Sequence, residues 1–171
     1  QASILRNILK KNCNKLNPSY ILSFWRSIFL SQINVQGGVK LILSNNISNL
    51  YIKIIYDYFS HDVEIITINS TSRALEKVYN EKNTLTILPY PNNNIGTKWW
   101  TNKRLEKLYA IAALPFFLKK KKSPSLIIVS KYKPVIEKDS YFLYISKYII
   151  KDKNMILETK SSKYYLYRSN N

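Results

Sequence analysis

The fold is decided by residues 39 to 89, which read VKLILSNNISNLYIKIIYDYFSHDVEIITINSTSRALEKVYNEKNTLTILP. Three short runs rich in Ile, Leu, Val and Thr alternate here with two segments whose apolar residues recur at helical spacing. The predicted strands are Val39 to Ser44, Val63 to Asn69 and Thr84 to Leu88, and the predicted helices are Ile47 to Phe59 and Thr71 to Glu81. This β-α-β-α-β order usually builds a parallel sheet with right-handed crossovers.

Two amphipathic helices are predicted before this unit. Residues 2 to 13 place apolar side chains at helical spacing, and Asn17-Pro18 starts the second helix, because Asn caps it and Pro is tolerated at its first position. We expect this second helix to run to about Gln36 and to stop at Gly37-Gly38. Its predicted buried stripe consists of Ile21, Phe24, Trp25, Ile28, Phe29 and Val35.

The residues after Leu88 indicate mainly strands. A polar loop, Asn92 to Thr97, leads to Trp99-Trp100 and to a short helix near Asn102 to Lys107. The predicted strands are Ala110 to Phe117, Leu126 to Lys131, Tyr141 to Lys147, Met155 to Thr159 and Lys163 to Arg168. We therefore predict an α+β chain, with helices in residues 1 to 38 and an α/β domain with a mostly parallel sheet in residues 39 to 171.

The net charge is +17, from 27 Lys and Arg against 10 Asp and Glu. Such a charge is typical of proteins that bind nucleic acid or another polyanion. However, Ile, Lys and Asn make 63 of the 171 residues, and because all three have A/T-rich codons we attribute part of the charge to coding bias. We expect no nucleic-acid partner, although the alternating Tyr and basic residues between Lys163 and Arg168 keep a nucleic-acid-binding protein as an alternative.

No cofactor or metal is expected. Cys13 is the only cysteine and His61 the only histidine, so the sequence has no Cys/His cluster at metal-ligand spacing. It also has no Walker A motif, dinucleotide-binding glycine pattern or nucleophile elbow. No apolar run reaches the roughly 18 residues of a membrane span, and no signal-peptide pattern is present. These features predict a cytoplasmic protein without a membrane partner.

Gln32 and Gln36 are the best candidates for a functional site. They lie four residues apart, so a helix projects both from one side, the side of Ile21, Trp25 and Ile28. Amides on an apolar face need hydrogen-bond partners. The partners could be each other, a helix terminus, water or a bound ligand, and the spacing does not distinguish these.

Residues 16 to 36, LNPSYILSFWRSIFLSQINVQ, resemble the third helix of the all-helical chorismate mutases, and FWRSI is typical of versions fused to a prephenate dehydratase domain. Residues 1 to 9 are similar to the end of the second mutase helix. Residues 39 to 89 resemble the first lobe of the periplasmic-binding-like dehydratase domain, and LPYPNNNIG at 88 to 96 is similar to the family's Leu-Pro-Ile-Glu-Asn-Ser-x-x-Gly. The chain thus resembles mutases that carry a shortened, dehydratase-like domain.

The resemblance implies an isomerase that converts chorismate to prephenate in the biosynthesis of phenylalanine and tyrosine, working as an intertwined homodimer. Gln36 falls on the pocket glutamine, whose amide N–H would meet the charge growing on the breaking ether oxygen. Gln32 falls on a small hydroxyl position and would contact the ring side or a carboxylate of chorismate. Gln1 falls on the pocket glutamate, and its carbonyl would accept a hydrogen bond from the substrate hydroxyl.

The departures from the family limit these expectations. The family's clamping arginines come mostly from a segment that would precede Gln1, so we interpret the chain as lacking the first mutase helix. Arg6 and Arg26 miss the clamp positions and are expected to face solvent or a second subunit. The dehydratase motifs are replaced by Ser44 to Ser48, Pro91 and Leu114-Pro115-Phe116, so no dehydratase activity is expected. The alternative is a catalytically decayed regulatory or ligand-binding module of the same pathway.

Overall fold

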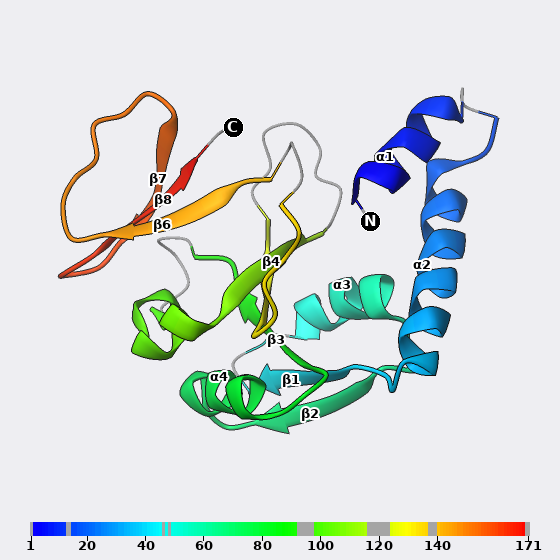
Figure 1. Ribbon diagram of the computed structural model, residues 1–171, viewed down its shortest axis with the longest axis horizontal. Coiled ribbons are helices and arrows are strands. Elements are labelled where there is room, and N and C mark those ends of the chain that lie inside the picture. Colours follow the sequence, from blue (N-terminus) through cyan, green and yellow to red (C-terminus); the bar gives the residue numbers. More distant parts are fainter. Residues whose placement is uncertain are drawn as a thin grey trace.

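The structure is a computed structural model that describes residues 2–12, 15–45, 47, 49–91, 98–115, 124–136 and 140–169. Over these residues it is an α+β chain with four α-helices, a five-stranded sheet and a three-stranded sheet. Figure 1 shows a helical hairpin at one side, the larger sheet in the middle and the smaller sheet at the C-terminal side. The predicted fold class, α+β, is confirmed.

The helical hairpin consists of α1 (Ala2–Lys11) and α2 (Pro18–Val35). Asn17 caps α2 as predicted, because its side-chain oxygen accepts a hydrogen bond from the Ser19 backbone N–H at 3.0 Å. The turn after α2 depends on Gly37 and Gly38, whose φ angles of 101° and 69° favour a residue without a Cβ. The predicted start of α2 and the glycine stop are therefore confirmed.

The predicted β-α-β-α-β unit is also confirmed. Its elements are β1 (Lys40–Ser44), α3 (Asn49–Phe59), β2 (Glu64–Ile68), α4 (Thr71–Asn80) and β3 (Thr84–Pro89). The strands are parallel in the order β2-β1-β3, and Lys40 lies in register with Glu64 and Thr84. The two helices cover opposite faces of the sheet, since Leu41 and Leu43 share a core with α3 while Ile42 shares a core with α4.

Two further strands, β4 (Tyr109–Leu114) and β5 (Leu126–Ser130), extend this sheet to the order β2-β1-β3-β5-β4. Because β5 runs antiparallel to both of its neighbours, the sheet is mixed, and the prediction of a mostly parallel sheet is corrected. Every residue of β5 is buried, as expected for a central strand. Such an apolar run indicates burial and contains no information about strand direction.

The smaller sheet is antiparallel and contains β6 (Phe142–Ser146), β7 (Met155–Lys160) and β8 (Tyr165–Ser169) in the order β6-β8-β7. The sequence predicted these strands but not their separation into a second sheet. Leu166 of β8 packs into the core on the α4 side of the larger sheet. Across the small sheet, the Arg168 Nε and Glu158 Oε1 atoms form an ion pair at 2.8 Å. The packing of Leu166 therefore joins the two sheets through apolar contacts.

Trp99 and Trp100 form the short 3₁₀ helix η1 (Trp99–Thr101), which precedes a second 3₁₀ helix, η2 (Lys103–Lys107). Both indole side chains are buried in the α4-side core. The Trp99 Nε1–H donates a hydrogen bond to the Pro89 carbonyl at 2.7 Å, which ties the 3₁₀ segment to the end of β3. The Trp-Trp element therefore packs the core.

Candidate functional site

Gln36 lies immediately after the last residue of α2. Its backbone N–H donates to the carbonyls of Gln32 and Ile33, at 3.2 and 3.1 Å, so the main chain of Gln36 closes the final turn of the helix. The side chains of Gln32 and Gln36 are both exposed. Solvent can therefore hydrate the two amides, and neither of them is a buried polar group that requires a protein partner.

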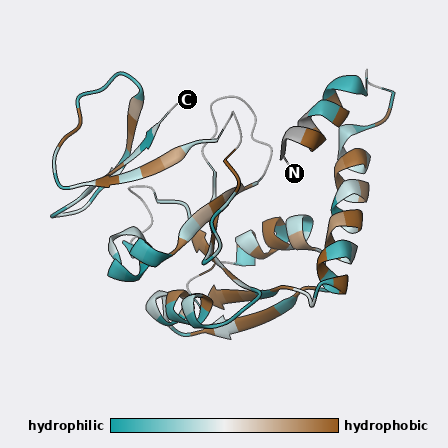
Figure 2. Cartoon of the chain, in the orientation of Figure 1, coloured by the Kyte–Doolittle hydropathy of each residue, from teal (hydrophilic) through white to brown (hydrophobic). Residues whose placement is uncertain are grey.

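The predicted buried stripe of α2 is wrong for the single chain, because no residue of α2 is buried. Tyr20, Phe24, Ile28 and Val35 are 73%, 70%, 41% and 82% exposed. We call these four residues the α2 face. The reason is that α2 packs chiefly against α1 and α3, which leaves its remaining side uncovered. Figure 2 shows hydrophobic segments along this helix at the outer edge of the molecule.

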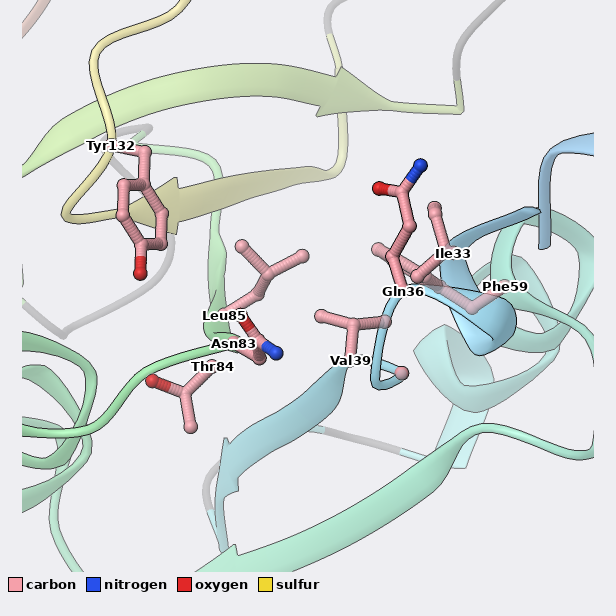
Figure 3. Close-up of a pocket in the computed structure, with 9 residues that line it drawn as sticks. Ile33, Gln36, Val39, Phe59, Asn83, Thr84, Leu85 and Tyr132 are labelled. Carbon is pink, nitrogen blue, oxygen red and sulfur yellow. The ribbon is translucent and has the colours of Figure 1, made fainter. Parts of the chain in front are cut away.

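A cleft of about 220 Å³ lies where α2 meets the amino ends of β1 and β3. We call it the junction cleft. Its walls are Ile33 and Gln36 from the end of α2, residues 38 and 39, Phe59 at the end of α3, residues 83–85 and Tyr132 after β5. In Figure 3, Tyr132 stands across the cleft from Gln36 and Ile33, with Leu85 and Val39 between them. No charged side chain is among the described residues that line it.

The structure describes two of the three predicted site residues, Gln32 and Gln36. Gln36 lines the junction cleft, but Gln32 is not among its lining residues. Gln1 lies outside the described residues. The spacing of four residues predicted a shared face, and Gln36 is the residue that caps α2 after its last residue, Val35, with φ −86° and ψ 13°.

Sequence reasoning missed Asn83 and Tyr132 as cleft residues. Asn83 has a φ of 54°, a left-handed conformation that Asn tolerates better than most residues. Its carbonyl accepts a hydrogen bond from the Lys40 backbone N–H at 2.9 Å, which joins the start of β1 to the turn before β3. An Asn directly before a β-rich run was the available signal for this turn. Tyr132 had no comparable signal.

Arg26 does not point freely to solvent or to a second subunit, so that expectation is corrected. Its Nη1 donates a hydrogen bond to the Asp57 carbonyl, and its guanidinium carbon lies 5.5 Å from the centroid of the Tyr58 ring. Burial lowers the pKa of Arg26, while Tyr58 and Asp57 oppose this shift. Burial also raises the pKa of Tyr58. Arg26 thus fastens α2 to α3. The side chain of Arg6 lies outside what the structure describes.

We predict that Arg26→Ala lowers the free energy of unfolding by about 2 kcal/mol, because it removes a charge-assisted hydrogen bond and a cation–π contact. Urea unfolding measures this change. Arg73→Ala is the matched control, since Arg73 is exposed on α4, and it should change the stability by less than about 0.5 kcal/mol. Equal effects of the two substitutions would contradict the assigned role of Arg26.

Among the described residues at the expected dehydratase-motif positions, Ser44, Pro91 and Leu114 are packed into the protein, whereas Asn45 is exposed. Leu114 at the end of β4 is fully buried, and Ser44 at the end of β1 is 2% exposed. Pro91 is buried as well. Asn46, Ser48 and Phe116, which belong to the same motif positions, lie outside the described residues. Leu114 and Pro91 carry no group that could transfer a proton.

His61 is exposed, and its ring stacks on Tyr56 with centroids 4.3 Å apart, as expected for a residue at a helix end. Cys13 is outside the described residues. Within the described ranges, no three His, Cys, Asp or Glu side chains are grouped so that they could bind a metal ion. Nor does that part of the chain contain a helix with the length and apolarity needed to cross a membrane.

Comparisons with known proteins found no match to this chain. No protein-family model, no curated protein and no solved structure matches the chain.

Proposed function

We propose that this chain is part of a chorismate mutase that acts as a homodimer through the α2 face. The observation that carries the proposal is an exposed glutamine amide, that of Gln36, at the end of a long helix with an uncovered apolar face. A helix of this kind fits the third helix of the all-helical mutases, which residues 16 to 36 resemble. Chorismate, a dianion, would be the substrate, and no cofactor is required.

The proposed chemistry suits an amide. Chorismate rearranges without a covalent intermediate, so the enzyme holds a compact conformer and stabilises the charge that develops on the breaking ether oxygen. The Gln36 amide N–H can donate to that oxygen, and it does so without a protonation step because the amide does not ionise near neutral pH. Gln32, one turn earlier and equally exposed, would contact the ring side or a carboxylate.

The charge distribution supports self-association through α2. The chain has 22 lysines, yet none lies between Leu16 and Val39. The only charged residue of α2 is Arg26, and its guanidinium is engaged at α3. Two copies that each carry +17 repel one another over most of their surface. The α2 face is therefore a place where two copies can approach without like charges meeting, and its exposed apolar side chains would be buried there.

Chorismate also requires cations that the described lining residues near Gln36 do not supply. The carboxylates of chorismate require positive partners. The described lining of the junction cleft holds none, and Arg26 is committed to Asp57 and Tyr58. We therefore propose that the substrate-binding pocket is completed by basic groups beyond those that one chain places at Gln36.

We predict that Phe24→Lys weakens self-association at least about tenfold, because it places two like charges at the centre of the proposed interface. Light scattering across a concentration series measures this, and chorismate turnover should fall together with the dimer fraction. Val135→Lys is the control, since Val135 is 89% exposed outside α2. A wild-type protein that stays monomeric at high concentration would refute the dimer.

The alternative of a decayed, ligand-binding module is favoured by one observation, the uncharged lining of the junction cleft. Chorismate turnover by the full-length native protein separates the two functions. Turnover that Gln36 controls supports the mutase, and a complete lack of turnover at saturating chorismate supports the module.

A further inference from the structure

One face of the small sheet is rich in aromatic side chains. Its central strand is β8, whose Leu166 packs into the α4-side core, so Tyr165 and Tyr167 project from the other face. Residues directly opposite each other in an antiparallel pair share a face. Tyr144 of β6 lies opposite Tyr167, and Phe142 shares its face two residues earlier. We call these four rings, Phe142, Tyr144, Tyr165 and Tyr167, the aromatic face.

The rings of the aromatic face lie beside one another, and three of them are accessible. The Phe142 and Tyr144 centroids are 6.2 Å apart, and those of Tyr165 and Tyr167 are 6.4 Å apart. Tyr144 is 42% exposed, and Phe142 and Tyr165 are partly exposed. Tyr167 is buried, and its hydroxyl accepts a hydrogen bond from the Ile150 backbone N–H at 2.9 Å, which holds the ring in place.

Lysines border the aromatic face. Lys160 of β7 lies opposite Tyr165 and therefore projects from the same face. The segments that join the three strands contribute four further exposed lysines, Lys147, Lys151, Lys153 and Lys163. From residue 141 to residue 169 the chain has only two acidic residues, and one of them, Glu158, is paired with Arg168. Coding bias accounts for the number of lysines, whereas the strand register places Lys160 among aromatic rings.

We propose that the aromatic face binds single-stranded nucleic acid. Aromatic rings stack on unpaired bases, and lysines attract the phosphate backbone. The charges favour this occupant over a second copy of the chain, because a second copy would bring like charges together. The α2 face differs in this respect, since α2 contains no lysine. A duplex fits less well, because its bases stack on each other and do not meet the rings.

This site is separate from the proposed mutase pocket. Figure 1 shows the small sheet and α2 at opposite sides of the molecule. The sequence indicated one strand of the site, residues 163 to 168, as a nucleic-acid-binding alternative, and the register adds the aromatic residues of β6. Binding is measured without chorismate, so the failure of one proposal leaves the other unaffected.

The test measures how the full chain binds a fluorescein-labelled oligouridylate of about 12 nucleotides, a length within the usual range of such sites, by fluorescence anisotropy. We expect micromolar affinity at about 150 mM salt and tighter binding at about 50 mM, because phosphate contacts release counterions. Tyr144→Ala should weaken binding about tenfold, the usual effect of losing one stacking ring. Tyr144→Phe keeps the ring and should bind like the wild type.

Ile145→Ala is the matched control for the ring. Ile145 follows Tyr144 on β6 and is 48% exposed, but it lies opposite Leu166 and so projects from the other face. It should leave binding within about twofold. For the lysines, Lys160→Gln should weaken binding and reduce the slope of log Kd against log salt by about 0.7, the share of one phosphate contact. Lys53→Gln, at an exposed lysine of α3, should change neither.

Three results would overturn the proposal. The first is absence of oligouridylate binding, and the second is an equal effect of Tyr144→Ala and Ile145→Ala or of Lys160→Gln and Lys53→Gln. The third is competition by inorganic polyphosphate as strong, per charge, as competition by unlabelled oligouridylate, which would show that charge alone is recognised. If Tyr144→Ala alters only the mass measured by light scattering, the face joins two copies of the chain and the proposal is wrong. The deoxy oligomer distinguishes RNA from DNA, since a preference for RNA requires a contact to the 2′-hydroxyl.

Discussion

Replacing Gln36 with alanine is expected to lower the kcat for chorismate by at least about 100-fold, the usual effect of losing one donor to a developing oxyanion. The amide N–H gains most when charge collects on the ether oxygen, so the loss should appear in kcat rather than in KM. Continuous measurement of chorismate consumption provides both constants. Wild-type turnover in Gln36→Ala would refute the assignment.

Asn34→Ala is the matched control for this experiment, because Asn34 is another exposed amide near the end of α2 and is assigned no contact with substrate. Its turnover should stay within twofold of the wild type. A similar loss in both variants would indicate a general disturbance of the helix end.

The pH dependence of turnover in Gln36→Glu gives a second test of the donor role of Gln36. A glutamate of ordinary pKa, about 4.3, is ionised at neutral pH, accepts hydrogen bonds only and repels a dianion. Turnover should therefore be low at pH 7 and should recover as the pH falls toward 4 to 5, where the protonated carboxyl can donate. The wild-type amide has no such titration. A parallel pH profile in the two proteins would contradict the donor role.

Trp99→Ala should lower the free energy of unfolding by about 3 to 5 kcal/mol, the cost of truncating a large aromatic side chain in a core. The indole is 8% exposed and packs with Trp100, Leu88 and Leu166, so its loss opens a cavity between the two sheets. The substitution also leaves the Pro89 carbonyl without its 2.7 Å partner. Urea-induced unfolding followed by circular dichroism measures the change.

Trp99→Phe keeps this test informative if the alanine variant fails to fold. Phenylalanine retains much of the apolar packing but cannot donate a hydrogen bond to Pro89, so the expected loss is about 1 to 3 kcal/mol. Tyr79→Ala is the control, because Tyr79 is exposed on α4, and it should change stability little. A loss below 1 kcal/mol in Trp99→Ala would mean that the Trp-Trp element does not hold the core together.

Local sequence signals located most elements of the fold. The predicted helix Thr71 to Glu81 and strand Thr84 to Leu88 differ by one residue from α4 and β3. The periodicity of apolar residues predicted these elements because each element buries one face or stripe of side chains. Asn17-Pro18 and Gly37-Gly38 set the ends of α2 through capping and positive φ, which are local properties of the chain.

The way in which distant elements pack against each other could be predicted less well from the sequence. The apolar stripe predicted a buried face of α2, but no residue of α2 is buried, because the described α1 and α3 cover the helix only in part. The direction of β5 and the separate small sheet depend on how distant strands meet, which alternation does not encode. Of the residues that line the junction cleft, the sequence predicted only Gln36 as a site residue. Tyr132 enters the cleft from a strand end that is 96 residues further along the chain, and no local pattern links the two.

The two attachments of α2 have a mechanical consequence. The helix is fastened in its middle by Arg26 to the end of α3, and at its end by the Gly37-Gly38 turn, after which Lys40 bonds to Asn83. A helix that is held at two points moves as a rigid body and does not bend at either attachment. Docking of another molecule on Tyr20, near the start of α2, would therefore apply a force that both attachments transmit to the amino ends of β1 and β3.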